Sequence, residues 1–171
     1  MQKPLLALSL VIALSGSAMG APVAWKSGTG DWFVGTNWVG DAVPAAGDDV
    51  SITNGSVLLT NSTPLLGSFT VRGASLVFSN WNTTLSVASN LLLQTNGVLT
   101  LSNSFTNTAT SNSMVLVCRD LMIEPGGGIN ADGKGFQGAY SPTAGVVNGH
   151  GPGGGAGNTI GGGCGGGSYG G

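Results

Sequence analysis

The sequence predicts an all-β fold, and three observations lead to that prediction. After residue 20 no segment places apolar residues at helical spacing over three turns, whereas short runs that alternate apolar and polar residues recur. Turn signals such as Asn96-Gly97 separate these runs. The pattern of a turn glycine followed by an apolar strand occurs four times, beginning at Gly55, Gly73, Gly97 and Gly128. We therefore expect the start of a right-handed parallel β-helix, with one solenoid coil per repeat.

An antiparallel β-sandwich is the alternative, because Asn-Gly is also the strongest short signal for a β-hairpin. Two observations favour the solenoid. The turn glycines are 18, 24 and 31 residues apart, which is in or near the range of solenoid repeats that carry insertions. The irregular polar stretch 103–113 also fits a coil corner better than a tight hairpin.

The first residues have the pattern of a signal peptide. Lys3 supplies a positive start, residues 5–14 are apolar, and Ala18-Met19-Gly20 is a small-x-small cleavage site. The apolar run is shorter than the roughly 20 residues that cross a bilayer as a helix, so we expect no membrane span after signal removal. The pattern predicts a secreted or cell-surface protein. The expected segments are the signal peptide (1–20), a tryptophan-rich N-terminal cap (21–49), β-solenoid coils (50–130) and a glycine-rich, weakly ordered tail (131–171).

Alternation within the expected coils predicts which side chains form the core. In the stretch 68–72 the large apolar side chains fall on one face and the polar ones on the other. We expect Ser68, Thr70, Arg72 and Ser86 to face solvent. The residues expected to point inward are Phe69, Val71, Leu76, Phe78, Leu85, Val87, Leu91 and Leu93.

Composition limits the classes of partner. Only 7% of the residues are charged and the formal net charge is −2. The cationic residues that remain after the signal are scattered, so the chain lacks the clustered charge that nucleic acid requires; they are Lys26, Arg72, Arg119 and Lys134. Cys118 and Cys164 lie outside any CxxC or Cys/His pattern, which gives no support to a zinc site and leaves a disulfide between them open.

The segment 25–52 contains three of the four tryptophans, and two interpretations are open. Trp25, Trp32 and Trp38 could form a platform on which sugar rings stack. Alternatively they plug the open N-terminal end of the solenoid, which every solenoid must cover. The second interpretation is favoured because this segment precedes the first regular strand.

This segment also resembles the opening of large exported bacterial surface proteins with β-helical, autotransporter-like or anchor-sorted architecture. Their W-x-G-x-G-x-W…NW-x-G…VP…GDDV pattern is matched here by Trp25, Gly28, Gly30, Trp32, Asn37, Trp38, Gly40, Val43, Pro44, Gly47, Asp48, Asp49 and Val50. The stretches 66–71, 84–87 and 121–135 look similar to theirs as well. The resemblance implies a β-helical architecture with glycine-rich insertions, and it implies architecture more than activity.

The residues that could act in catalysis lack the neighbouring motifs that a catalytic or metal site requires. Asp48 and Asp49 are the only adjacent acidic pair, but no D-x-D-x-D or repeated G-G-x-G-x-D pattern accompanies them to complete a calcium site. His150 is the sole histidine, it lies in a glycine tract, and no G-x-S-x-G elbow supplies a nucleophile. We therefore expect no enzymatic activity in this segment, no catalytic or metal-binding residues and no cofactor.

The function expected from the sequence is that of a secreted or cell-surface structural or adhesive protein. Its expected partners are an extracellular glycan or the cell envelope, with self-association as a further possibility. Two alternatives stay open: the N-terminal part of a β-helical carbohydrate-active enzyme, and a carbohydrate-binding module that uses the N-terminal tryptophans.

Overall fold

The computed structural model describes residues 20–26, 28–80, 82–104, 113–139, 148–150 and 154–157. The expected signal peptide up to residue 19, Cys164 and the glycine tract from residue 158 lie outside these ranges. Within them the protein is all-β, as the alternation of apolar and polar residues predicted. One 3-10 helix, η1 (Gly35–Asn37), accompanies the strands of this part of the chain.

The strands are short and follow one another through the described residues. They are β1 (Pro22–Ala24), β2 (Thr29–Asp31), β3 (Asp49–Ile52), β4 (Ser56–Leu59), β5 (Ser68–Val71), β6 (Ser75–Phe78), β7 (Thr84–Ser86), β8 (Asn90–Leu93), β9 (Val98–Leu101), β10 (Val115–Val117), β11 (Asp120–Ile123) and β12 (Gly128–Asn130).

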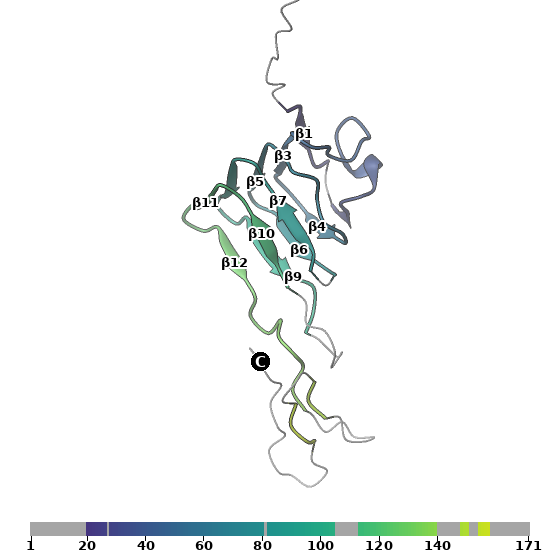
Figure 1. Ribbon diagram of the computed structural model, residues 1–171, viewed down its shortest axis with the longest axis vertical. Coiled ribbons are helices and arrows are strands. Elements are labelled where there is room, and N and C mark those ends of the chain that lie inside the picture. The colour runs from purple at the N-terminus through teal and green to yellow at the C-terminus, as the bar shows by residue number, and fades with distance from the viewer. Residues whose placement is uncertain are drawn as a thin grey trace, which may run out of the picture.

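Three parallel sheets are built from these strands (Figure 1). Sheet 1 has the order β1-β3-β5-β8-β11, sheet 2 pairs β7 with β10, and sheet 3 has the order β12-β9-β6-β4-β2. Strands that follow each other in sequence therefore lie in different sheets. Strands that lie side by side are separated by a full passage of the chain, as between Asp49 and Ser68, 19 residues apart.

The antiparallel sandwich considered from the Asn-Gly turns is wrong, because every pair of named strands in the described structure is parallel. The Asn-Gly turns do not join hairpin partners. Asn54-Gly55 leads from β3 in sheet 1 to β4 in sheet 3, and Asn96-Gly97 leads from β8 in sheet 1 to β9 in sheet 3. A short turn signal fixes the local backbone, but the pairing partner is chosen by burial of the apolar face.

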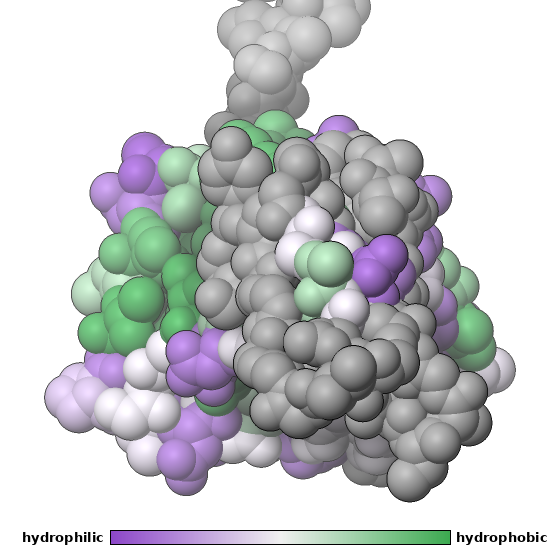
Figure 2. Space-filling model, turned by 90° about the horizontal axis from the view of Figure 1, so that it is seen from below, coloured by the Kyte–Doolittle hydropathy of each residue, from purple (hydrophilic) through white to green (hydrophobic). Residues whose placement is uncertain are grey.

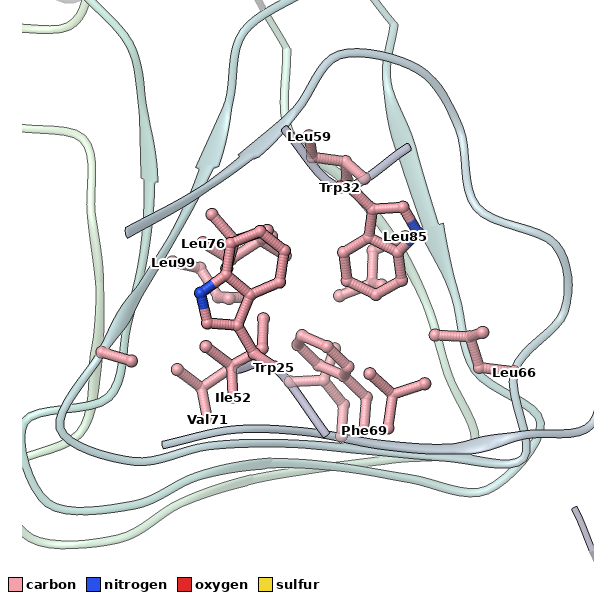
Figure 3. Close-up of a cluster of buried hydrophobic side chains, with 14 of the residues drawn as sticks. Trp25, Trp32, Ile52, Leu59, Leu66, Phe69, Val71, Leu76, Leu85 and Leu99 are labelled. Atoms are coloured by element: carbon pink, nitrogen blue, oxygen red, sulfur yellow. The ribbon is translucent and has the colours of Figure 1, made fainter. Parts of the chain in front are cut away.

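A continuous apolar core lies between the sheets, and Figure 3 shows its side chains converging from all three. The central strands of sheets 1 and 3 have buried residues at every second position. All eight side chains predicted to point inward are buried. Arg72 is exposed as predicted, whereas Ser68, Thr70 and Ser86 are half-buried.

One corner between sheets 1 and 3 shows why glycine is needed there. Gly55 has φ +75°, a left-handed conformation that non-glycine residues rarely adopt. A Cβ atom built on Gly55 would lie 2.0 Å from the carbonyl oxygen of Gly28. Gly28 precedes β2 in the same way that Gly55 precedes β4, and these two strands are neighbours in sheet 3. The backbone passes too closely here for any side chain.

The described part of the glycine-rich segment contacts the sheets. Lys134 Nζ donates to the carbonyl oxygen of Ser102 at 2.7 Å, and the Phe136 side chain is buried. Further along, His150 N donates to the carbonyl oxygen of Gln137 at 2.9 Å. The Lys134 bond ties the start of the segment to the residue after β9, whereas the His150 bond joins two parts of the segment itself.

Candidate functional site

The three N-terminal tryptophans form one aromatic cluster at the β1 and β2 end of the sheets. The ring centroids of Trp25 and Trp38 are 5.0 Å apart with an interplanar angle of 84°, and those of Trp32 and Trp38 are 4.8 Å apart at 70°. Both are edge-to-face arrangements, which aromatic quadrupoles favour. Trp32 also meets Phe69 of β5, with centroids 5.8 Å apart, so the cluster joins the core of sheet 1.

Local backbone geometry holds this cluster in place. Trp25 extends sheet 1, because its N–H donates to the carbonyl oxygen of Ser51, and Trp32 extends sheet 3 through its N–H bond to Leu58. The chain then turns through η1 and returns to place Trp38 against Trp25, to which it is joined by an antiparallel bridge. Trp38 Nε1 donates to the carbonyl oxygen of Trp32 at 2.7 Å.

The sugar-stacking interpretation of Trp25, Trp32 and Trp38 disagrees with their burial. Trp32 and Trp38 are 0% exposed and Trp25 is 3% exposed, so no ring offers a face to a pyranose. Figure 3 shows the Trp25 and Trp32 rings among the aliphatic side chains of the core. Stacking needs an open ring face, and here each ring packs on other aromatic and aliphatic side chains. Sequence spacing could not show this, because an exposed platform and a buried plug use the same residue types.

Asp48 and Asp49, the candidate acidic pair, are engaged in separate structural bonds. Asp48 Oδ2 accepts the N–H of Ala45 at 2.7 Å and closes the turn before β3. Asp49 Oδ1 accepts the Ser68 hydroxyl at 2.6 Å on the neighbouring strand. The two carboxylates therefore hold the local backbone and a strand pair, and each one has its own separate partner.

The remaining candidates are dispersed in the described residues. His150 is half-buried in the glycine-rich segment, and its Nδ1 has no hydrogen-bond partner among the described residues. Cys118 follows β10 and packs against the core, while Cys164 falls outside the described ranges. No group of three or more His, Cys, Asp or Glu side chains that could hold a metal ion occurs in that part of the chain.

A row of polar side chains on the outer face of sheet 1 is the arrangement best suited to contact another molecule. The register of β3, β5 and β8 places outward-facing positions side by side. The residues in this polar row are Asp49, Ser51, Ser68, Thr70 and Asn90, and the one apolar outward position among these strands is Leu92, which is in register with Thr70. Neighbouring strands lie about 4.8 Å apart, so the row presents hydroxyl, amide and carboxylate groups at regular intervals.

The outer face of sheet 3 differs in chemistry. There Ser56 and Ser75 are hydrogen-bonded to each other at 3.0 Å, and the other outward positions of β4, β6 and β9 carry apolar Leu58, Val77 and Val98 beside polar Thr100. Sequence reasoning missed the polar row on sheet 1 as a unit. The alternation showed that Ser68 and Thr70 point outward, but the uneven steps between repeats concealed which residues would stand beside them.

The fold and this face together define a class: in its described residues this is an all-β protein of parallel sheets, with a buried aromatic cluster at one end and a polar row along one face. A family model described as the G8 domain matches residues 37–114, from the end of η1 to the residue before β10. The matched range includes the strands from β3 to β9, and Trp25 and Trp32 lie before it. No curated protein and no solved structure matches the chain.

In the described part of the chain, no helix is both long enough and apolar enough to cross a membrane.

Proposed function

We propose that this chain is a secreted or cell-surface structural or adhesive protein whose described segment serves contact and not catalysis. Its strands are the coils of a right-handed parallel β-helix, residues 21–49 cover the first coil, and the outer face of sheet 1 is the contact surface. Export is supported by the signal-peptide pattern of residues 1–20. The resemblance to exported bacterial β-helical proteins agrees with this assignment.

The β-helix is supported by the order in which the chain visits the sheets. Each strand of sheet 1 is followed in sequence by a strand of sheet 3, and the next strand of sheet 1 pairs in parallel beside the previous one. A parallel crossover connection is right-handed in nearly all known cases, which supports the proposed handedness. Hydrogen-bonded side chains one coil apart are separated by 19 to 31 residues, as in the Ser75–Ser56 and Ser113–Asn82 pairs.

The polar row is the observation that carries the contact function. It combines hydroxyl and amide groups, which both donate and accept hydrogen bonds, with only one charged side chain, Asp49. Such a face can hydrogen-bond to the hydroxyl groups of an extended polysaccharide, because successive sugar units can each contact a successive strand. We therefore propose an extracellular glycan or the glycan part of a cell envelope as the partner.

The experiment is a binding assay of the exported chain on insoluble polysaccharides, isolated cell envelopes and a glycan array. Thr70→Arg places a bulky cation at the centre of the polar row and should lower binding at least tenfold. Ser75→Arg is the matched control, because Ser75 is a half-buried hydroxyl residue that faces outward on sheet 3. Equal loss in both variants, or no binding of the unmodified chain to any of these surfaces, would contradict the proposal.

A further inference from the structure

The two ends of the stacked sheets are built differently. At the β1 end, Pro22 lies in the outer strand and has no N–H to offer to another strand, which is one way in which proteins block a sheet edge. Trp25 and Trp38 close the core beside it. This end of the sheets is protected against further strand pairing.

At the other end the outer strand of sheet 1 is β11, and all four of its residues are exposed. Leu121 and Ile123 stand in register with Leu91 and Leu93 of β8, so they continue the inward-facing columns of the core. Leu121 is 43% exposed and Ile123 is 49% exposed, whereas Leu91 and Leu93 are fully buried. Seen from this end, apolar side chains gather on the side where β11 lies (Figure 2).

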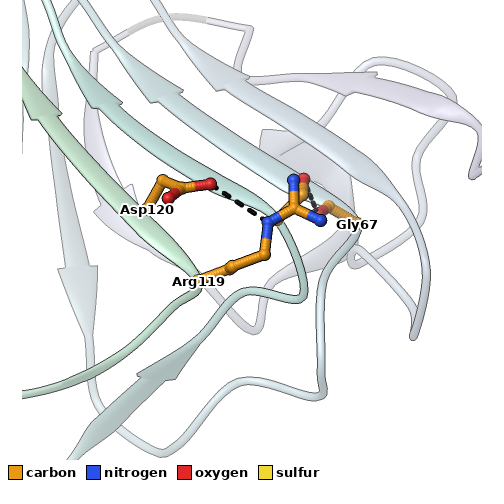
Figure 4. Close-up of polar contacts among 4 residues, drawn as sticks. Gly67, Arg119 and Asp120 are labelled. Atoms are coloured by element: carbon orange, nitrogen blue, oxygen red, sulfur yellow. Dashed lines mark hydrogen bonds and ion pairs between the residues drawn. The ribbon is translucent and has the colours of Figure 1, made fainter.

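This edge lacks the usual devices that prevent pairing. The sequence of β11 is Asp-Leu-Met-Ile, with no lysine and no proline. Its single charged residue, Asp120, is offset by Arg119, whose Nε donates to Asp120 Oδ2 at 3.0 Å (Figure 4). Among the described residues β11 pairs only with β8, and an apolar strand with an unpaired edge is a template for another strand.

The geometry points to a second copy of this chain as the partner, bound edge to edge through β11 about a two-fold axis. The arrangement of β11 is self-complementary, because Leu121 and Ile123 lie symmetrically on either side of Met122. Antiparallel pairing centred on Met122 places Leu121 opposite Ile123 of the copy, and Met122 opposite its own counterpart. Inward-facing residues then meet inward-facing residues, so the two cores become continuous.

Two considerations favour a dimer over other assemblies. A two-fold interface uses the same patch on both copies and closes on itself. The protected β1 end cannot accept the β11 edge of another copy, so a head-to-tail filament is disfavoured. The pairing also has one opposing contribution, since Asp120 would face Glu124 of the copy, and like charges directly opposite each other are destabilising. Arg119, already bound to Asp120, offsets part of that negative charge and reduces the repulsion.

The register predicts a specific cross-link. Residues opposite each other in an antiparallel pair have Cα atoms about 4.5–5.5 Å apart, and disulfides need about 4.4–6.8 Å. In a Cys118→Ser, Cys164→Ser background, Met122→Cys should form a covalent dimer upon mild oxidation, with most of the chain cross-linked. Val39→Cys is the control, because Val39 is an exposed apolar residue in the loop that returns to Ala24 of β1. Equal cross-linking of the two variants would overturn the proposed register.

The mass in solution provides the second test, on the full exported chain by size-exclusion chromatography with light scattering. We expect twice the chain mass at micromolar concentration, and the single-chain mass for Leu121→Asp. Because Leu121 is already exposed at the edge, this substitution should leave the fold intact, which circular dichroism checks. A monomer at all concentrations would overturn the proposal. Strong hydrogen-exchange protection of β11 in such a monomer would show that other residues of the same chain cover the edge.

Discussion

Replacing Trp32 with alanine distinguishes the two roles that the tryptophan-rich segment could have. Trp32 is fully buried, its ring meets Trp38 and Phe69, and it bridges sheet 3 and sheet 1. If the ring served glycan stacking on the surface, Trp32→Ala would abolish binding and leave stability unchanged. The structure predicts the reverse, with a large loss of stability as the primary effect.

The magnitude follows from two opposing contributions. Truncating a tryptophan that is buried in a packed core to alanine lowers the free energy of unfolding by about 3–5 kcal/mol. Trp32 Nε1, however, is buried without a hydrogen-bond partner among the described residues, and such a donor already lowers the stability of the folded state by about 1–3 kcal/mol. Truncation removes that penalty as well. We expect a net loss of about 3 kcal/mol, at the low end of the range.

The assay is urea unfolding monitored by circular dichroism, because the tryptophan fluorescence signal would change with the substitution itself. A loss of about 3 kcal/mol lowers Tm by about 10 °C in a domain of this size. Trp32→Phe keeps most of the ring and removes the unpartnered N–H, so it should change stability by less than about 1.5 kcal/mol. Phe33→Ala, at the partly exposed neighbouring aromatic, should cost less than about 1 kcal/mol.

The cluster interpretation fails if Trp32→Ala costs less than about 1 kcal/mol, or if it costs no more than Phe33→Ala. Loss of glycan binding by a Trp32→Ala protein of unchanged stability would support the sugar-stacking interpretation instead.

The remaining predictions concern the core, one corner and the absence of catalysis. Phe78→Ala should destabilise by about 3–5 kcal/mol in urea unfolding, because Phe78 is fully buried; a near-zero effect would mean that the strand register is wrong. Gly55→Ala should lower Tm markedly through its left-handed φ and its contact with Gly28, whereas Gly128→Ala, with open space around its Cβ position, should be tolerated. The exported chain should release no reducing sugar from pectin, alginate or xylan. Reproducible turnover that disappears in Asp48→Asn would contradict that expectation.

Much of the local structure was predictable because strand alternation has a strict period of two. Once Phe69 and Val71 are assigned inward, Thr70 between them must face outward, and the same rule places Leu76 and Phe78. The eight core positions were therefore correct. The preference of Gly55 for a turn was also readable, since few other residues adopt its conformation.

The candidate site was less predictable, because its members come from different strands. Asp49 meets Ser68 across 19 residues, whereas Gln94 meets Glu124 across 30. A local pattern contains no information on how long each passage through the sheets will be. The polar row on sheet 1 therefore became visible only when the register of β3, β5 and β8 was known.

The sequence by itself determined the all-β class, the inward-facing positions of the strands between residues 69 and 93, and the scarcity of charge that argues against nucleic acid as a partner. The tertiary structure decided that the strands pair in parallel, that Trp25, Trp32 and Trp38 are buried, and that Leu121 and Ile123 are exposed at the edge of sheet 1. The physical reason is that alternation and turn preference act between neighbours in the chain. Burial depends instead on which distant strand covers a side chain, and Leu91 and Leu121 have the same local pattern but only Leu91 has a strand on both sides.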